Sequence, residues 1–230
     1  MLFGDCRRHL AELEAESIDL VVTDPPYNTG LRAGASRLHH FFDDAMDAGE
    51  YRALTREVSA QLFRVLKGNH AAYVFINWKS LGVWLDALAA AGFRLKNCVV
   101  WDKVLRLDYQ NYAYAHEFLI FAVKGRFFPK NRGTGDDSFK DVWHVSRVTR
   151  RESAAVPHHE TVRPLEVIRR PIEHASAPGD LVLDPFAGSG TTCVVAKELG
   201  RRYLGIERDA AYYRLCLRRL SDLQLAEATA

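Results

Sequence analysis

Short apolar runs alternate with helical patterns along most of this chain. Apolar runs of strand length predict buried strands at residues 1–3, 18–23, 71–76, 95–101, 117–123, 181–183 and 202–206. Apolar residues at helical spacing predict helices at residues 6–16, 51–66, 80–91, 163–175, 193–199 and 210–225. Strands that alternate with helices in this way predict a doubly wound α/β sheet. Two segments lack such a pattern: residues 30–47, which we expect to be a loop, and the polar, basic residues 127–156.

A rigid turn is predicted directly after the strand at 18–23. The sequence there is Asp24-Pro25-Pro26-Tyr27-Asn28, and each proline fixes its own φ and restricts the residue before it. The turn therefore holds a carboxylate, backbone carbonyls and an aromatic face together at the carboxyl end of a strand. Taken alone, the same residues are equally compatible with an ordinary turn.

A loop of small residues follows the strand at 181–183. It consists of Asp184, Pro185, Phe186, Ala187, Gly188, Ser189, Gly190, Thr191 and Thr192. In an α/β sheet this loop lies where ligands bind, and the two glycines let the backbone approach a bound molecule without a Cβ. Glu207 ends the next strand, close to the roughly 20-residue spacing at which an acidic residue meets ribose hydroxyls.

The glycine loop leaves several interpretations open. Its glycines do not match G-x-G-x-x-G, which disfavours a nicotinamide or flavin cofactor. A generic nucleotide-binding turn and a tight strand–helix junction both remain compatible with the loop alone.

Composition is that of an ordinary globular protein, with 48% hydrophobic and 26% charged residues in a chain of 230. No apolar run reaches the roughly 18 residues that span a bilayer, and no signal peptide is recognisable, so we expect a cytoplasmic protein without a membrane segment. The four cysteines form no C-x-x-C pair, which predicts reduced thiols, and we expect no metal site.

Charge is distributed unevenly although the net charge is only +2. Acidic residues outnumber basic ones between residues 5 and 50, and basic residues outnumber acidic ones between residues 94 and 151. Ordinary solvated surface would account for this, but a basic middle segment is also where a polyanion would be expected to lie.

The two motifs together resemble the amino-methyltransferases of DNA. The spellings are D-P-P-Y-N at 24–28 and D-P-F-A-G-S-G-T-T at 184–192, and their order resembles the β-class, in which the catalytic motif precedes the cofactor motif. Gly4-Asp5-Cys6, His116-Glu117 and Gly205-Ile206-Glu207 extend the match. The segment 159–164 looks like the family's H-P-T-x-K-P, with Glu160 in place of proline and Arg163 in place of lysine. The resemblance covers nearly the whole chain except about 28–50 and 127–157.

The resemblance implies a fold and a cofactor. The fold is a mostly parallel, seven-stranded Rossmann-like sheet with an antiparallel strand, permuted so that the cofactor half is C-terminal. The cofactor is S-adenosylmethionine. Residues 1–230 would form a single methyltransferase domain, with 127–157 as a short target-recognition insertion within it.

The resemblance also implies roles for individual residues. Asp24, Pro25, Pro26 and Tyr27 would be catalytic. The Asp184–Thr192 loop would hold the methionine part of the cofactor, Glu207 its ribose, and Asp5 with Cys6 its adenine end. Thr161 and Arg163 would reach its carboxylate.

These residues make chemical sense for transfer to an exocyclic amine. Such an amine is a poor nucleophile because its lone pair is delocalised into the base. Asp24 and the Pro25 carbonyl would accept its two hydrogens and free the lone pair. Tyr27 would stack on a base that has been rotated out of the duplex.

The expected substrate is the N6 amine of adenine in double-stranded DNA. In the family, D-P-P-Y goes mostly with adenine N6 and S-P-P-Y mostly with cytosine N4. Cytosine N4 in DNA and adenine in RNA are the alternatives, and a catalytically silent nucleic-acid-binding module is a more remote one. A homodimer and a cognate restriction endonuclease are compatible with the family.

Overall fold

The computed structural model describes residues 1–30, 44–104, 112–131, 140–148 and 163–228, and no side chain beyond residue 223. Its helices are α1 (Cys6–Glu12), α2 (Ala48–Val65), α3 (Leu81–Ala91), α5 (Leu165–Ala175), α6 (Thr191–Glu198) and α7 (Ala210–Ala228). Its strands are β1 (Leu2–Phe3), β2 (Ile18–Thr23), β3 (Leu66–Ile76), β4 (Arg94–Asp102), β5 (His116–Lys124), β6 (Val142–His144), β7 (Leu181–Asp184) and β8 (Arg202–Glu207). Most of the predicted loop at 30–47 lies outside the described residues.

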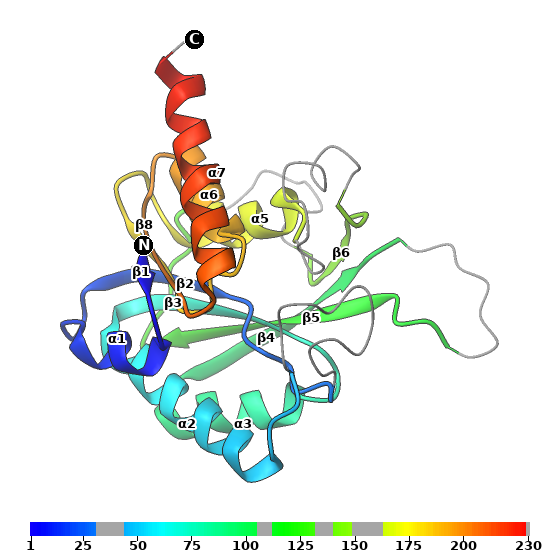
Figure 1. The fold of residues 1–230 in the computed structure, drawn as a ribbon. Coiled ribbons are helices and arrows are strands. Elements are labelled where there is room, and N and C mark those ends of the chain that lie inside the picture. Colours follow the sequence, from blue (N-terminus) through cyan, green and yellow to red (C-terminus); the bar gives the residue numbers. More distant parts are fainter. Residues whose placement is uncertain (31–43, 105–111, 132–139, 149–162, 229–230) are drawn as a thin grey trace.

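All the described strands join in one mixed sheet, in the order β1-β8-β7-β2-β3-β5-β4-β6 (Figure 1). β5 is antiparallel to its neighbours β3 and β4, and the other pairs are parallel. The α/β class, the mostly parallel sheet and the antiparallel strand predicted from the sequence are confirmed. The number of strands is not, because the sheet has eight rather than seven. The additional edge strand β6 pairs with β4 and comes from the basic segment in which no strand was predicted.

Helices cover both faces of the sheet, as Figure 1 shows for α2 and α3 on one side and α5 and α6 on the other. The alternation of side chains along β2 explains this arrangement. Val21 packs in one core with α1, α2 and α3, whereas its neighbours Leu20 and Val22 pack in the other core with α5 and α6. Because both faces are buried, all six residues of β2 are buried, as is typical of a central parallel strand.

Element boundaries differ modestly from the predicted ones. α1 ends at Glu12 rather than at residue 16, because Leu13 has an extended backbone. α2 begins earlier, at Ala48, because the Asp47 carboxylate accepts the N–H of Gly49 and so caps the helix. α2 ends at Val65, one residue before the predicted end, because β3 starts directly at Leu66.

The order of the strands brings the two sequence motifs side by side. β2 pairs in parallel with β7, with Leu20 opposite Val182 and Val21 opposite Leu183. Their carboxyl ends therefore lie at the same edge of the sheet, and the D-P-P-Y turn and the glycine loop leave the sheet there. Among the described residues, no helix is long and apolar enough to cross a membrane.

Candidate active site

A hydrogen bond joins the two motifs. The Thr23 hydroxyl, at the end of β2, donates to Asp184 Oδ1, at the end of β7, over 2.7 Å, and both side chains are buried. Beside this bond the two loops open into a cavity of about 670 Å³. Asp24 and Phe186 both line this cavity. A base bound at one loop and a cofactor bound at the other would therefore meet.

Two helices hold the D-P-P-Y turn in place. The Tyr51 hydroxyl of α2 donates to the Pro26 carbonyl over 2.9 Å, and Trp84 Nε1 of α3 donates to the Tyr51 hydroxyl over 3.0 Å. The Ser80 hydroxyl, at the N-terminus of α3, donates to the Tyr27 carbonyl. Among the described residues, no group donates to the Pro25 carbonyl, so of the three carbonyls it is the one left to accept from a ligand.

A buried carboxylate fixes the far end of the same turn. Asn28 has a left-handed backbone (φ 52°), and its N–H donates to Asp44 Oδ1 over 2.7 Å. Asp44 Oδ2 accepts the Thr29 N–H over 2.8 Å. In turn, Asn28 Oδ1 accepts the N–H of Met46 over 2.7 Å. The turn is thus fastened on both sides before any ligand binds, which is the preorganisation that an active site requires.

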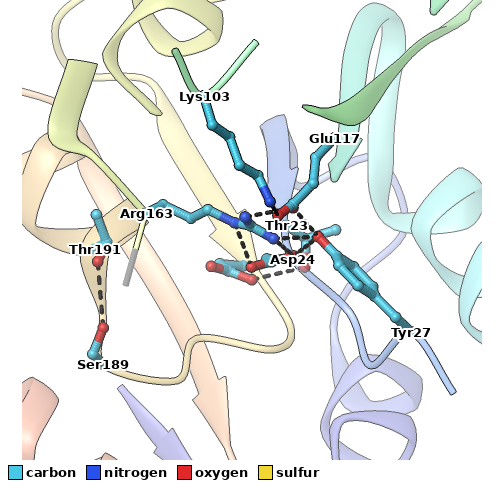
Figure 2. Close-up of polar contacts among 9 residues, drawn as sticks. Thr23, Asp24, Tyr27, Lys103, Glu117, Arg163, Ser189 and Thr191 are labelled. Carbon is cyan, nitrogen blue, oxygen red and sulfur yellow. Dashed lines mark hydrogen bonds and ion pairs between the residues drawn. The ribbon is translucent and has the colours of Figure 1, made fainter. Parts of the chain in front are cut away.

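Asp24 lies in a cluster of charged side chains, shown in Figure 2. Arg163 Nε lies 2.8 Å from Asp24 Oδ2 and Arg163 Nη2 lies 2.9 Å from Asp24 Oδ1, so the guanidinium grips the carboxylate with two parallel bonds. The third nitrogen, Nη1, lies 2.5 Å from Glu117 Oε2. The Tyr27 hydroxyl donates to Asp24 Oδ1 over 2.5 Å, and Lys103 Nζ pairs with Glu117 Oε1.

The surroundings explain the protonation of this cluster. Burial disfavours the charge on Arg163, yet Asp24 and Glu117 together hold the pKa of its guanidinium above the usual value. Burial raises the pKa of the Tyr27 hydroxyl, against the opposing effect of the Arg163 charge. Tyr27 is therefore a neutral donor to Asp24, and Arg163 remains a cation.

The position of Arg163 differs from the role predicted for it. The resemblance places it on the cofactor's carboxylate, whereas here its nitrogens are directed at Asp24, Glu117 and the Tyr27 hydroxyl. The guanidinium also lies 5.3 Å from the ring centroid of Trp101 and 5.4 Å from that of Phe75. A planar fork with several donors suits this setting, and a lysine could not form the same two-fold contact.

The acidic end of the glycine loop is deeply buried. Burial raises the pKa of Asp184 to about 7, although the hydroxyls of Thr23 and Thr192 and the Phe186 N–H donate to the carboxylate and oppose this rise. A cationic group that binds beside a buried carboxylate of this kind stabilises its ionised form.

Glu207 organises the loop as well as facing the cavity. Its Oε2 accepts the Gly188 N–H and its Oε1 accepts the Asp209 N–H, each over 2.7 Å. Burial raises the pKa of this carboxyl above its usual value. Because a carboxylate offers about four acceptor positions, these two bonds leave room for ribose hydroxyls.

Gly190 has a different reason to be glycine from the one predicted. It does not line the cavity. A Cβ at this position would lie 2.1 Å from the Sγ of Cys216 on α7, and its φ of +79° also favours glycine. Gly190 therefore permits close packing of the loop on α7. Arg219 of α7 fastens the same loop by donating to the Ser189 carbonyl over 2.7 Å.

Most of the predicted site residues come together in this one cavity. Those that line it are Asp5, Cys6, Asp24, Pro25, Pro26, Tyr27, Arg163, Asp184, Pro185, Phe186, Ala187, Gly188, Ser189, Thr191, Thr192 and Glu207. Thr161 lies outside the described residues. The individual roles given to these residues stay predictions.

Several residues around the site could not be assigned to it from the sequence alone. Tyr51, Ser80 and Trp84 lie within the predicted helices at 51–66 and 80–91, and no role in the site was inferred for them. Asp44 lies in the segment 30–47, which has no pattern. Glu117 belonged to the matched His116-Glu117 pair, but no role was inferred for it. Only the pairing of strands and helices brings these side chains to the turn.

The lining fits S-adenosylmethionine, which carries a sulfonium and an ammonium group, ribose hydroxyls and an apolar adenine. Asp5, Asp184 and Glu207 line the cavity, and carboxylates are suited to the cationic groups and the hydroxyls. Phe186 and Ile206 provide apolar surface for a purine ring.

Comparison with known proteins identifies the family of this chain. A family model described as DNA methylase (N6_N4_Mtase) matches residues 18–218. The type II methyltransferase M.HinfI of Haemophilus influenzae is 31% identical over 252 residues, which span 97% of this chain and 68% of that protein.

Two solved structures share the fold. The M1.HpyAVI–SAM complex has a TM-score of 0.73 and 22% identity, and the match covers 95% of this chain and 97% of that one. The PvuII DNA methyltransferase, named as cytosine-N4-specific, has a TM-score of 0.74 and 18% identity, and the match covers 94% of this chain and 84% of that one. At these identities the two structures bear on the fold alone. The family match and the M.HinfI match show that this chain belongs to the S-adenosylmethionine-dependent DNA methyltransferases of the β-class.

Proposed function

We propose that this chain transfers a methyl group to the exocyclic N6 amine of adenine in DNA, with the target base rotated out of the duplex. One observation carries the proposal. The Asp24 carboxylate and the Asp184 loop face the same cavity, and the Thr23–Asp184 hydrogen bond fixes them side by side. A base amine at Asp24 would lie next to a methyl donor held by the loop.

Asp24 and the Pro25 carbonyl would activate the amine. The carboxylate oxygens have lone pairs beyond those used by Arg163 and Tyr27, and the Pro25 carbonyl has no donor among the described residues. Each would accept one hydrogen of the amine and so hold its lone pair in line with the donor. Asp24 is also placed to favour the positive charge that the nitrogen gains, and to take the proton that it then loses.

The cavity side of the turn would hold the base. The bound cofactor supplies an electrophilic methyl group on a sulfonium sulfur. Tyr27 lines the cavity and can offer its ring to a rotated base, where stacking contributes roughly 1–3 kcal/mol. Asp184 would meet the cationic part of the cofactor and Glu207 its ribose.

The aspartate at position 24 supports adenine over cytosine, because D-P-P-Y resembles the adenine enzymes and S-P-P-Y the cytosine enzymes. The order of the motifs and the D-P-P-Y-N spelling support DNA over RNA. The basic segment 127–157 would contact DNA. Within this segment, residues 132–139 and 149–157 lie outside the described residues.

The decisive experiment measures transfer of labelled methyl from S-adenosylmethionine to unmethylated double-stranded DNA and, in parallel, to RNA, followed by digestion to nucleosides. We expect the label in N6-methyl-2′-deoxyadenosine. Label in N4-methyl-2′-deoxycytidine would contradict the choice of base, and label only in RNA would contradict the choice of polymer. If no nucleic acid accepts the label while the chain binds the cofactor, the silent-module alternative holds.

Replacing Asp24 should reduce the rate of methyl transfer without reducing the affinity for the cofactor. We expect Asp24→Ala to lower transfer by roughly 10³-fold or more, because the amine loses its charged acceptor, while cofactor affinity is largely retained. Asp24→Asn, which keeps the shape but not the charge, should be similarly impaired. Asp86→Ala, on the exposed surface of α3, serves as the control and should leave transfer unchanged. A fully active Asp24→Ala variant would refute the role of this carboxylate.

A further inference from the structure

The charged cluster beside Asp24 includes residues outside the D-P-P-Y turn to which the proposed methyl transfer gives no role. Lys103, Glu117, Arg163 and Asp24 follow one another with alternating charge (Figure 2). Lys103 is 6% exposed, Arg163 is 8% exposed, and the Glu117 side chain is 13% exposed. Charged side chains this far from water are costly unless each is paired, so the cluster is balanced at two cations and two anions.

Lys103 and Glu117 are held rigidly by the sheet. Trp101 and Asp102 of β4 lie opposite Glu117 and His116 of β5, and the Lys103 N–H donates to the Ala115 carbonyl over 2.8 Å. Burial alone would raise the pKa of Glu117, but the charges of Arg163 and Lys103 hold it below the usual value. Glu117 is therefore a fixed anion at the back of the site.

Methyl transfer makes the balance of charge at Asp24 important. The amine nitrogen gains positive charge as the methyl group arrives, and Arg163, a cation in direct contact with Asp24, opposes this gain. Glu117 lies 2.5 Å from Arg163 and offsets its charge. The Glu117 carboxylate also lies 3.1 Å from the Tyr27 hydroxyl, so it helps to hold both groups that contact Asp24.

We infer that Glu117 and Lys103 are positioning residues for the methyl transfer, which act through Arg163 to fix the orientation of Asp24 and to keep the cluster around it neutral. This inference rests on the proposed function, because it gives Asp24 the catalytic part. Neither residue lines the cavity, so neither is expected to touch the base or the cofactor.

Neutralising Glu117 tests the inference. Glu117→Gln leaves the cluster with one excess positive charge and with a weaker hold on Arg163. We expect kcat for methyl transfer to fall roughly 10²-fold, while the dissociation constant for S-adenosylmethionine stays close to that of the wild type. Glu16→Gln is the matched control, because Glu16 pairs with Lys124 at the other end of β5 over 3.1 Å but is exposed. Its kcat should equal that of the wild type.

A double variant distinguishes charge balance from packing. Lys103→Met combined with Glu117→Gln restores a neutral cluster without restoring the contact between Glu117 and Arg163. We expect its kcat to recover about tenfold relative to Glu117→Gln and to remain about tenfold below the wild type. Thermal unfolding and cofactor titration establish that each variant is folded.

The outcomes separate the two proposals. A wild-type chain that methylates no nucleic acid would overturn the proposed function and, with it, this inference. If the wild type is active, wild-type kcat in Glu117→Gln would overturn the inference alone, as would a folded double variant no more active than Glu117→Gln. If Glu117→Gln does not fold, the double variant decides, and wild-type kcat in that variant would overturn the inference.

Discussion

Asp184 is the residue whose environment has the clearest chemical consequence. Its carboxyl is buried, and its pKa is raised to about 7 from an ordinary value of 3.8. Between these two pH values the folded chain retains a proton that the unfolded chain has lost. The free energy of unfolding should therefore decrease as the pH rises from about 4 to 7, and above 7 this contribution should stay constant.

We expect Asp184→Asn to remove this dependence. The asparagine cannot ionise, so the ligand-free variant should be more stable than the wild type at pH 8, by at most about 4 kcal/mol, and similar to it near pH 4. Cofactor affinity in the wild type should rise as the pH passes 7, because the ionised carboxylate binds a cation, and this rise should be absent in the variant. Urea unfolding between pH 4 and 8.5 measures the first effect, and calorimetry of cofactor binding between pH 6 and 8.5 measures the second.

The control for this prediction is Asp222→Asn, at an exposed position of α7. It should leave both pH profiles unchanged. Equal pH profiles of unfolding for the wild type and Asp184→Asn would show that Asp184 does not titrate in this range.

At the scale of elements, the site depends on how α6, α7 and the sheet pack together. The loop before α6 approaches α7 so closely that a methyl group on the Cα of Gly190 would have no space. Arg219 of α7 also donates a hydrogen bond to this loop. α7 thus supports the Asp184–Thr192 loop by packing and by this hydrogen bond. The D-P-P-Y turn is supported in a similar way by Tyr51 of α2 and Trp84 of α3.

We expect Gly190→Ala to be destabilising by about 3 kcal/mol or more. Left-handed backbone costs a non-glycine residue about 1–2 kcal/mol, and overpacking against Cys216 adds about 1–3 kcal/mol. Cofactor affinity should decrease as well, because the loop must shift. Denaturant unfolding measures the first effect and calorimetry the second.

Gly179→Ala provides the comparison, since Gly179 has a similar φ of +87° but a Cβ added there would meet no atom within 4 Å. It should cost only the backbone term of about 1–2 kcal/mol and leave cofactor affinity unchanged. Equal losses of stability in the two variants would show that the contact with Cys216 is unimportant.

For the whole molecule, the distribution of charge predicts how DNA is bound. The basic segment 127–157 contains the edge strand β6, and its arginines at 150 and 151 lie outside the described residues. Contacts of such side chains with phosphates give affinity that does not depend on sequence.

Replacing both Arg150 and Arg151 with alanine should weaken DNA binding at moderate salt. The slope of log K against log salt should become shallower by roughly 2, because each phosphate contact contributes about 0.9. Cofactor binding should not change. Fluorescence anisotropy with a short duplex at several salt concentrations measures the slope.

Arg214→Ala with Arg218→Ala removes the same charge from exposed positions on α7 and should leave the slope unchanged. Equal slopes for the wild type and the Arg150/Arg151 variant would exclude these two residues from the DNA contact.

The sequence by itself determined the class of the fold, most of the helices and strands, and the two motifs of the site. These features are local: apolar periodicity decides whether a segment is a helix or a strand, and prolines and glycines fix the turns that follow. The edge strand β6 was missed because its three residues carry too little pattern, and only pairing with β4 defines it.

Only the tertiary structure decided which side chains surround Asp24 and Gly190. Arg163 reaches Asp24 because α5, which begins just after it, packs against β2. Glu117 reaches Arg163 because β5 lies next to β3, one strand away from β2, and Cys216 reaches Gly190 because α7 packs on the loop. These contacts join residues far apart in the chain, and they depend on the order of strands and the packing of helices. A buried charge takes its partner from whatever the fold places beside it, and no local pattern in the sequence records that choice.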